Sequence, residues 1–101
     1  MIVEYTRYRI SEDRSATFLD AYEKASYHLK TSPHCLAYEL SRCTEEADRY
    51  ILRIEWTSIA AHIEGFRKNA SFPEFFLLVK PFIQQIEEMR HYEPMPVDHR
   101  S

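Results

Sequence analysis

The strongest pattern in the sequence is the stretch CLAYELSRCTEEADRYILRIEW, residues 35–56. Apolar side chains alternate with other side chains along both of its halves, which is typical of strands that bury one face. A polar turn at 44–48 separates the halves, so residues 35–43 and 49–56 are predicted to form a β-hairpin. One side of the first strand carries Leu36, Tyr38 and Leu40, and one side of the second carries Tyr50, Leu52, Ile54 and Trp56.

The segment before the hairpin predicts a strand followed by a helix. Residues 2–10 are rich in β-branched and aromatic side chains and lack a breaker, which favours a strand. Ser11 can cap a helix that begins after it, and an apolar stripe at helical spacing runs to about Lys30. The stripe consists of Phe18, Tyr22, Ala25 and Leu29.

The segment after the hairpin predicts two short helices and a last strand. Thr57 or Ser58 can cap the first of these helices. A Ser-x-x-Glu capping box at Ser71, with a proline in the first turn, begins another helical segment, which Pro81 ends. Residues 83–92 are then predicted to form the fourth strand.

The order of these elements is strand, helix, strand, strand, helix, helix, strand, a split β-α-β arrangement. Right-handed crossovers then give a four-stranded antiparallel sheet with the helices on one face, which is an α+β, ferredoxin-like fold. We assign this domain to residues 1–92. Residues 93–101, which contain two prolines, are interpreted as a tail or linker.

The sheet face away from the helices would be left open. Its expected residues are too apolar for water and too charged for an ordinary core. We therefore predict a homodimer in which two such faces pack together and charges of both signs pair across the contact. The residues expected on this face are Ala37, Glu39, Ile51, Arg53 and Glu55, with some of Glu4, Thr6 and Tyr8.

Composition excludes several classes of protein. The 101 residues include 13 Lys and Arg against 16 Asp and Glu, for a net charge of −3, and the basic residues are scattered, so a nucleic-acid partner is not expected. The sequence shows neither a signal-peptide pattern nor an apolar run long enough for a membrane, which predicts a cytoplasmic protein without a membrane partner. Cys35 and Cys43 are eight residues apart on one predicted strand, too far for a disulfide, so both thiols are expected to be reduced.

No metal or cofactor is expected from the local motifs. His34, His91 and His99 show no ligand spacing with one another, and neither a His-x-Glu nor a Cys-x-x-Cys motif is present. A Gly-rich phosphate loop is also missing from a sequence with one glycine, so a flavin is not expected.

A few residues are candidates for a site. Trp56, on the helix-facing side of its strand, can stack on a flat aromatic ligand, although core packing explains it as well. His62 is a candidate catalytic base for a phenolic proton, or a packed bystander. Tyr5 and Arg7 share a strand face and can anchor a phenolate or carboxylate, or form structural pairs.

Further candidates come from the helices. The aromatic cluster that includes Phe66 and Phe76 is either plain core or the wall of an apolar pocket. His28, beside the apolar stripe of the first helix, is the next candidate base after Tyr5, although solvent exposure is its default.

The residues around the second helix resemble a known family. The motif consists of Trp56, Thr57-Ser58, His62, Phe66, Ser71-Phe72 and Phe75-Phe76. It is similar to the strand-W-x-S-helix-helix stretch of the antibiotic biosynthesis monooxygenase superfamily of dimeric α+β barrels, and the resemblance covers about residues 1–92. It implies a pocket between the sheet and the helices of each subunit.

This resemblance also implies chemistry. Enzymes of the family oxygenate electron-rich aromatics such as quinols without metal or flavin, and other members degrade haem. Haem-degrading members resemble one another in an Asn on the first strand and a His in the third helical segment. This sequence has Tyr5-Thr6-Arg7 and Phe76 there, so haem breakdown is not expected.

Three functions are therefore open from the sequence. The first is a cofactor-independent monooxygenase acting on a small quinol or polyphenol. The second is a non-catalytic domain that binds a small ligand as a sensor or accessory unit, and the third is a purely structural dimer module. Fold-level analogy carries most of the first hypothesis.

Overall fold

The computed structural model describes residues 1–99 and contains one antiparallel sheet of four strands. These are β1 (Ile2–Arg9), β2 (Cys35–Arg42), β3 (Arg49–Trp56) and β4 (Ile86–Tyr92). Their order across the sheet is β2-β3-β1-β4, and every neighbouring pair is antiparallel. The central strands β1 and β3 pair in unbroken register from Ile2 opposite Trp56 to Arg9 opposite Arg49. The predicted split β-α-β fold is confirmed.

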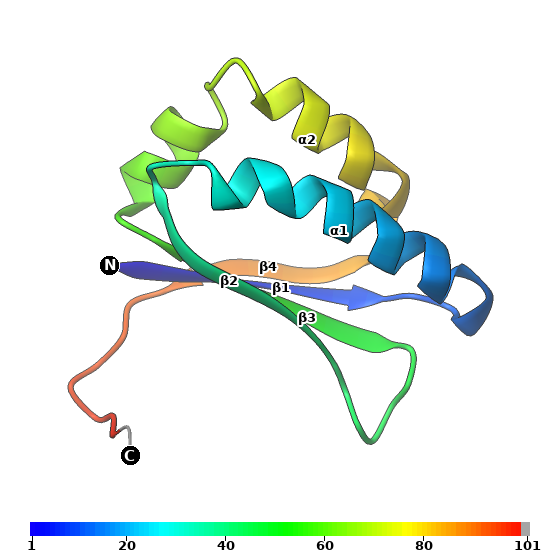
Figure 1. Cartoon of the computed structure of the whole chain (residues 1–101). Helices are drawn as coiled ribbons and strands as arrows, with labels where there is room; N and C mark the ends of the chain where they lie inside the picture. The colour runs from blue at the N-terminus through cyan, green and yellow to red at the C-terminus, as the bar shows by residue number, and fades with distance from the viewer. Residues whose placement is uncertain (100–101) are drawn as a thin grey trace.

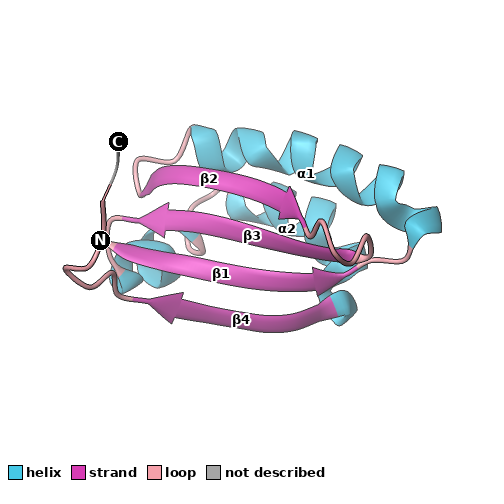
Figure 2. Cartoon of the chain, turned by 90° about the horizontal axis from the view of Figure 1, so that it is seen from below, coloured by secondary structure: helices cyan, strands magenta, loops and turns pink. Residues whose placement is uncertain are grey.

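All helical segments lie on one face of this sheet (Figure 1), and the other face is visible without cover from helices in Figure 2. Helix α1 (Ser15–Lys30) follows a 3-10 turn, Glu12–Arg14. A π-helical segment, Ala61–Phe66, and helix α2 (Phe72–Val79) follow β3, and a 3-10 turn over Lys80–Gln85 leads into β4. Within residues 1–99, none of the helices combines the length and the apolar character needed to span a bilayer.

Helix boundaries depart from the sequence prediction where side chains find other partners. Ser58 caps as expected, since its hydroxyl accepts the Ala61 N–H at 2.9 Å. The capping box at Ser71 is wrong, because the Ser71 hydroxyl donates to Asn69 Oδ1 at 3.0 Å instead. Ser11 makes no side-chain cap either.

The start of β4 also departs from the prediction. Helix α2 ends at Val79, just before Pro81 as predicted, but the chain continues as a 3-10 segment to Gln85 with Pro81 in its first turn. Strand β4 therefore begins at Ile86, three residues later than predicted.

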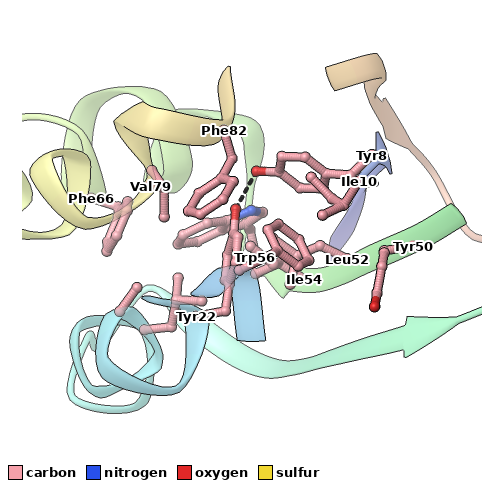
Figure 3. Packing of buried hydrophobic residues seen from close by; sticks show 13 residues of the cluster. Tyr8, Ile10, Tyr22, Tyr50, Leu52, Ile54, Trp56, Phe66, Val79 and Phe82 are labelled. Atoms are coloured by element: carbon pink, nitrogen blue, oxygen red, sulfur yellow. Dashed lines mark hydrogen bonds between the residues drawn. The ribbon is translucent and has the colours of Figure 1, made fainter. Parts of the chain in front are cut away.

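The core lies between the sheet and α1 and is centred on Phe18. Its ring lies 5.0–5.2 Å from those of Tyr8, Tyr22, Tyr50 and Phe82. Figure 3 shows this cluster, with Trp56 and Ile54 beneath Phe82 and a hydrogen bond joining the Tyr8 and Tyr22 hydroxyls. Both cysteines are free, as expected.

Strand β1 sends Glu4, Thr6 and Tyr8 to the helix side, where each is at most 3% exposed. The sequence prediction that some of these three lie on the open face is wrong. Tyr5 and Arg7 occupy that face instead, where the Tyr5 hydroxyl accepts a hydrogen bond from Arg53 Nε at 3.3 Å. Alternation along a strand fixes which residues share a face, but it does not say which face is covered.

Candidate functional site

A cavity of about 390 Å³ lies between the sheet and the helices, next to the core. Aromatic side chains form much of its wall, and they come from β3, the π-helical segment and α2. These aromatic residues are Trp56, Phe66, Phe72, Phe75 and Phe76. A volume in this range, with mostly apolar walls and a few polar groups, is typical of small-ligand sites.

Glu4 provides a buried carboxyl group at the cavity. It sits on the helix side of β1, and its Oε1 accepts the Trp56 indole N–H at 2.9 Å. Its Oε2 accepts the Thr6 hydroxyl at 2.8 Å. Two neutral donors thus hold the carboxyl group of Glu4 in one orientation inside a largely apolar environment.

His62 lies directly beside this carboxyl group. Its ring stacks on Trp56 with centroids 4.4 Å apart and planes 5° from parallel. Its Nδ1 lies 3.5 Å from Glu4 Oε1 and 2.7 Å from His91 Nε2. Burial, followed by the positive charge of Arg67 and by His91, lowers the pKa of His62 to about 3, so the imidazole is neutral at ordinary pH.

The local backbone explains the position of His62. Arg67 N–H bonds to the His62 carbonyl at 3.1 Å, the five-residue step of a π-helix, and such segments are frequent at functional sites. Gly65 lets this segment lie close to His34, just before the start of β2, because a Cβ at Gly65 would come within 2.6 Å of the His34 ring. The wide turn aims His62 at the sheet.

A second polar group at the cavity is the hydrogen-bonded pair of Tyr8 and Tyr22. Burial raises the pKa of Tyr8 to about 12 and that of Tyr22 well above its usual value. Both phenols therefore keep their protons and act as neutral hydrogen-bond groups. Tyr8 is two residues along β1 from Thr6, so three polar groups of the cavity, those of Glu4, Thr6 and Tyr8, follow one strand.

Four of the residues proposed from sequence line the cavity: Trp56, His62, Phe66 and Phe76. Tyr5 and Arg7 lie on the opposite face of the sheet, where Arg7 pairs with Glu88 at 3.4 Å. His28 is 8% exposed and so is not in solvent as expected, and its Nε2 lies 3.7 Å from Glu74. It is not among the residues that line the cavity.

Sequence reasoning missed Glu4, Thr6, Tyr8, Tyr22 and His91 as site residues. For the three on β1, the available signal was their even spacing, which puts a carboxyl group on the same face as Tyr8. His91 lies opposite Glu4 in the pairing of β1 with β4, and its partners are 87 and 29 residues away along the chain. No local motif reveals such an arrangement.

The comparisons with known proteins agree with this architecture. The sequence profile of the antibiotic biosynthesis monooxygenase family matches residues 1–76. An uncharacterised protein of Bacillus subtilis, YczJ, is 28% identical over 93 residues, which cover 92% of this chain and 98% of that protein.

Solved structures show the same fold. One is a Bordetella bronchiseptica protein with the provisional name antibiotic biosynthesis monooxygenase, at a TM-score of 0.76 and 25% identity, over 93% of this chain and 96% of the other. A conserved protein of Methanosarcina mazei aligns at a TM-score of 0.78 and 14% identity, over 93% and 92%. With its ferredoxin-like fold and with a profile match over three quarters of its length, the chain belongs to the antibiotic biosynthesis monooxygenase family.

Proposed function

We propose that the chain is a monooxygenase that acts on a small, electron-rich aromatic molecule, a quinol or polyphenol, without an organic cofactor. The observation that carries this proposal is the aromatic cavity with Glu4 and His62 buried at its wall. The family to which the chain belongs supports the reaction class.

The walls of the cavity suit a flat ligand. Trp56, Phe66 and Phe76 present aromatic surface, and stacked or edge-to-face ring pairs contribute about 0.5–1.5 kcal/mol beyond burial of area. The volume of about 390 Å³ lies near the lower end of small-molecule sites, which favours a ligand of few rings.

The proposed reaction balances without an external reductant. One atom of O₂ is inserted at a ring C–H of the quinol, and the other atom leaves as water. The product is a hydroxyquinone, and the substrate supplies all four electrons that reduce O₂. The protein is then required to position the substrate, to stabilise its electron-rich form and to keep bulk water away.

His62 keeps a place in this proposal, with a changed role. A histidine with a pKa of about 3 is a weak proton acceptor, so the sequence-based role of general base does not suit it in the free protein. We assign it contact with the phenolic oxygen of the substrate, beside Trp56, on which the His62 ring is stacked.

Oxygen uptake against a panel of hydroquinones tests the proposal, with mass spectrometry of products formed under ¹⁸O₂. We expect one labelled oxygen atom in the product, and we expect Trp56→Ala to abolish ligand binding while His62→Ala weakens kcat more than binding. Leu77→Ala, on the exposed surface of α2, is the matched control and should behave as wild type. Melting curves for each variant separate loss of a site from loss of the fold.

The outcomes separate the alternative functions. Tight binding of a hydroquinone without oxygen uptake contradicts the monooxygenase and supports a non-catalytic ligand-binding or accessory domain. Failure of the whole panel to bind contradicts both and leaves a structural dimer module.

A further inference from the structure

Three potential metal ligands from distant parts of the chain converge beside the cavity. Glu4 comes from β1, His62 from the π-helical segment and His91 from β4. One ligand atom of each lies within 4.8 Å of the other two. Glu4 and His62 are 3% and 4% exposed, and His91 is half-buried.

The hydrogen bonds among these groups leave the arrangement incompletely explained. His62 Nδ1 contacts both His91 Nε2 and Glu4 Oε1, so this one nitrogen faces two potential acceptors. A neutral imidazole has one N–H, and a carboxylate has none to offer. In either tautomer of the His62–His91 contact, one N–H therefore lies among three potential ligand atoms, whereas a cation interacts favourably with the lone pairs of all three at once.

The distances are close to those that a small cation requires. Zinc binds histidine nitrogen at about 2.0–2.1 Å and carboxylate oxygen at about 2.0–2.2 Å, so two ligands at the tetrahedral angle are roughly 3.4 Å apart. The observed separations from His62 Nδ1 are 2.7 Å to His91 and 3.5 Å to Glu4. The separation to Glu4 is close to this value, the contact to His91 is shorter, and all three ligand atoms lie within 4.8 Å of one another.

The surroundings resemble the outer shell of a metal site. Ligating carboxylates in proteins are normally held by further hydrogen bonds, and ligating imidazoles are fixed in orientation. Glu4 accepts hydrogen bonds from Trp56 and Thr6, and the parallel stack on Trp56 fixes the His62 ring. A buried carboxyl group that has no Lys or Arg partner among the ion pairs of residues 1–99 is also typical of groups that coordinate a metal.

We propose that Glu4, His62 and His91 together bind one divalent first-row transition-metal ion next to the aromatic cavity. Two imidazoles and one carboxylate favour Fe²⁺ through Zn²⁺ over Mg²⁺ or Ca²⁺, which prefer oxygen ligands alone. Three protein ligands leave coordination positions open, and Glu4 and His62 both line the cavity.

The charges indicate which ligand would fill an open position. A divalent ion with one carboxylate leaves one positive charge, and Arg67, which also lines the cavity, adds a second. An anionic aromatic oxygen, a phenolate, matches this charge and the aromatic walls. The identity of this ligand rests on the function proposed above, whereas the ion site does not.

Metal titration of the full chain tests the site. After treatment with a chelator, the protein is titrated with Co²⁺, followed by its visible absorption, and with Zn²⁺ by calorimetry. We expect about one ion per chain, and a loss of affinity of at least about 100-fold in Glu4→Gln and in His91→Gln. Thr6→Val, which removes only a hydrogen bond to Glu4, should lose about 10–100-fold.

The control is His99→Gln, because His99 lies in the exposed tail and should not contribute. His91→Gln is the most informative variant, because His91 is half-buried on the edge strand β4 and its substitution leaves the core unchanged. A melting curve of this variant shows whether it folds. Equal affinity in wild type and His91→Gln, or no Co²⁺ spectrum in wild type, overturns the metal site. A bound ion together with no oxygen uptake on any hydroquinone overturns the proposed reaction and supports the site.

Discussion

Both faces of the sheet carry polar side chains, but these side chains are buried on the helix side and partly exposed on the open side. On the helix side, Glu4 and His62 are almost fully buried, and neither forms an ion pair with Lys or Arg among residues 1–99. On the open side, Arg53 pairs with Glu55, and Arg7 with Glu88, and all four remain partly exposed. The open face thus keeps its charges paired and hydrated, which costs little free energy.

The burial of Glu4 and His62 on the helix side lowers the stability of the fold. A buried carboxyl group and a buried imidazole have lost their hydration, and an apolar core of the same shape would usually be as stable or more so. Polar groups retained at such a position are typical of functional sites, where local stability is lost in exchange for chemistry. The open face, in contrast, is the surface through which we expect two copies of the chain to pack together.

The largest expected effect is on stability, from a truncation on the helix side. Trp56 is fully buried, stacks on His62 and donates to Glu4. Trp56→Ala should lower the free energy of unfolding by about 3–5 kcal/mol. Tyr5→Ala, an aromatic truncation on the open face, should cost clearly less in the monomer. Urea denaturation of both variants measures this, and equal losses would remove the distinction between the faces.

The hydrogen-bonded tyrosines give the next effect. Tyr22→Phe leaves the buried Tyr8 hydroxyl without its partner, which should cost about 1–3 kcal/mol. Replacing both tyrosines by Phe removes both polar groups, so the double variant should be less destabilised than the sum of the two single ones. Denaturation of the four proteins completes this cycle, and simple additivity would mean that the hydroxyls do not interact.

Most of the fold could be predicted from the sequence because the strands carry strong local patterns. The pairing of β2 with β3 follows from the alternation in residues 35–56, and its one irregularity lies at Leu36. Besides the face assigned to Glu4, Thr6 and Tyr8, the failures were at the ends of elements, for example where Ser71 bonds to Asn69 and not to the backbone. The two possible hydrogen-bond partners of such a side chain differ in free energy by only a fraction of one hydrogen bond. The sequence pattern therefore does not indicate which partner is bound.

The candidate site was only partly predictable for a different reason. Trp56 and His62 are marked by residue type and by a family motif, so both were found. Glu4 and His91 are ordinary in their local context and become neighbours only through the pairing of β1 with β4. The spacing of potential metal ligands along the chain is informative when the ligands share a loop or helix. Glu4, His62 and His91 lie on three different elements, so their spacing predicts nothing.

The open face should support the homodimer predicted from sequence. Ile51→Lys places an unpaired charge in the middle of this face, opposite Arg7 in the register of β1 and β3. We expect the dimer dissociation constant to rise at least about tenfold, which corresponds to about 1.4 kcal/mol. Leu77→Lys on the exposed surface of α2 is the matched control. Sedimentation at micromolar concentration measures both, and a wild-type monomer would contradict the prediction.

A chemical difference, with no cost in stability, concerns a thiol at the edge of the helix side. Cys35, the first residue of β2, is paired with Trp56 and packs against the core, and burial raises the pKa of its thiol from 9.0 to about 11. Only the thiolate is alkylated, so at pH 9 roughly 1% of Cys35 is reactive, against about half of an ordinary thiol.

Iodoacetamide should therefore modify Cys35 roughly 50-fold more slowly in the folded chain than in concentrated urea at pH 9. The Cys43→Ser variant isolates this thiol, and the unfolded chain serves as an internal standard for the same residue. The rate in the folded protein should rise tenfold per pH unit up to about pH 11, because the thiolate population grows in that proportion below the pKa. Equal alkylation rates of Cys35 in the folded and unfolded protein would mean that water reaches the start of β2 on the helix side. The contrast between a buried helix side and an exposed open face would then not extend to Cys35.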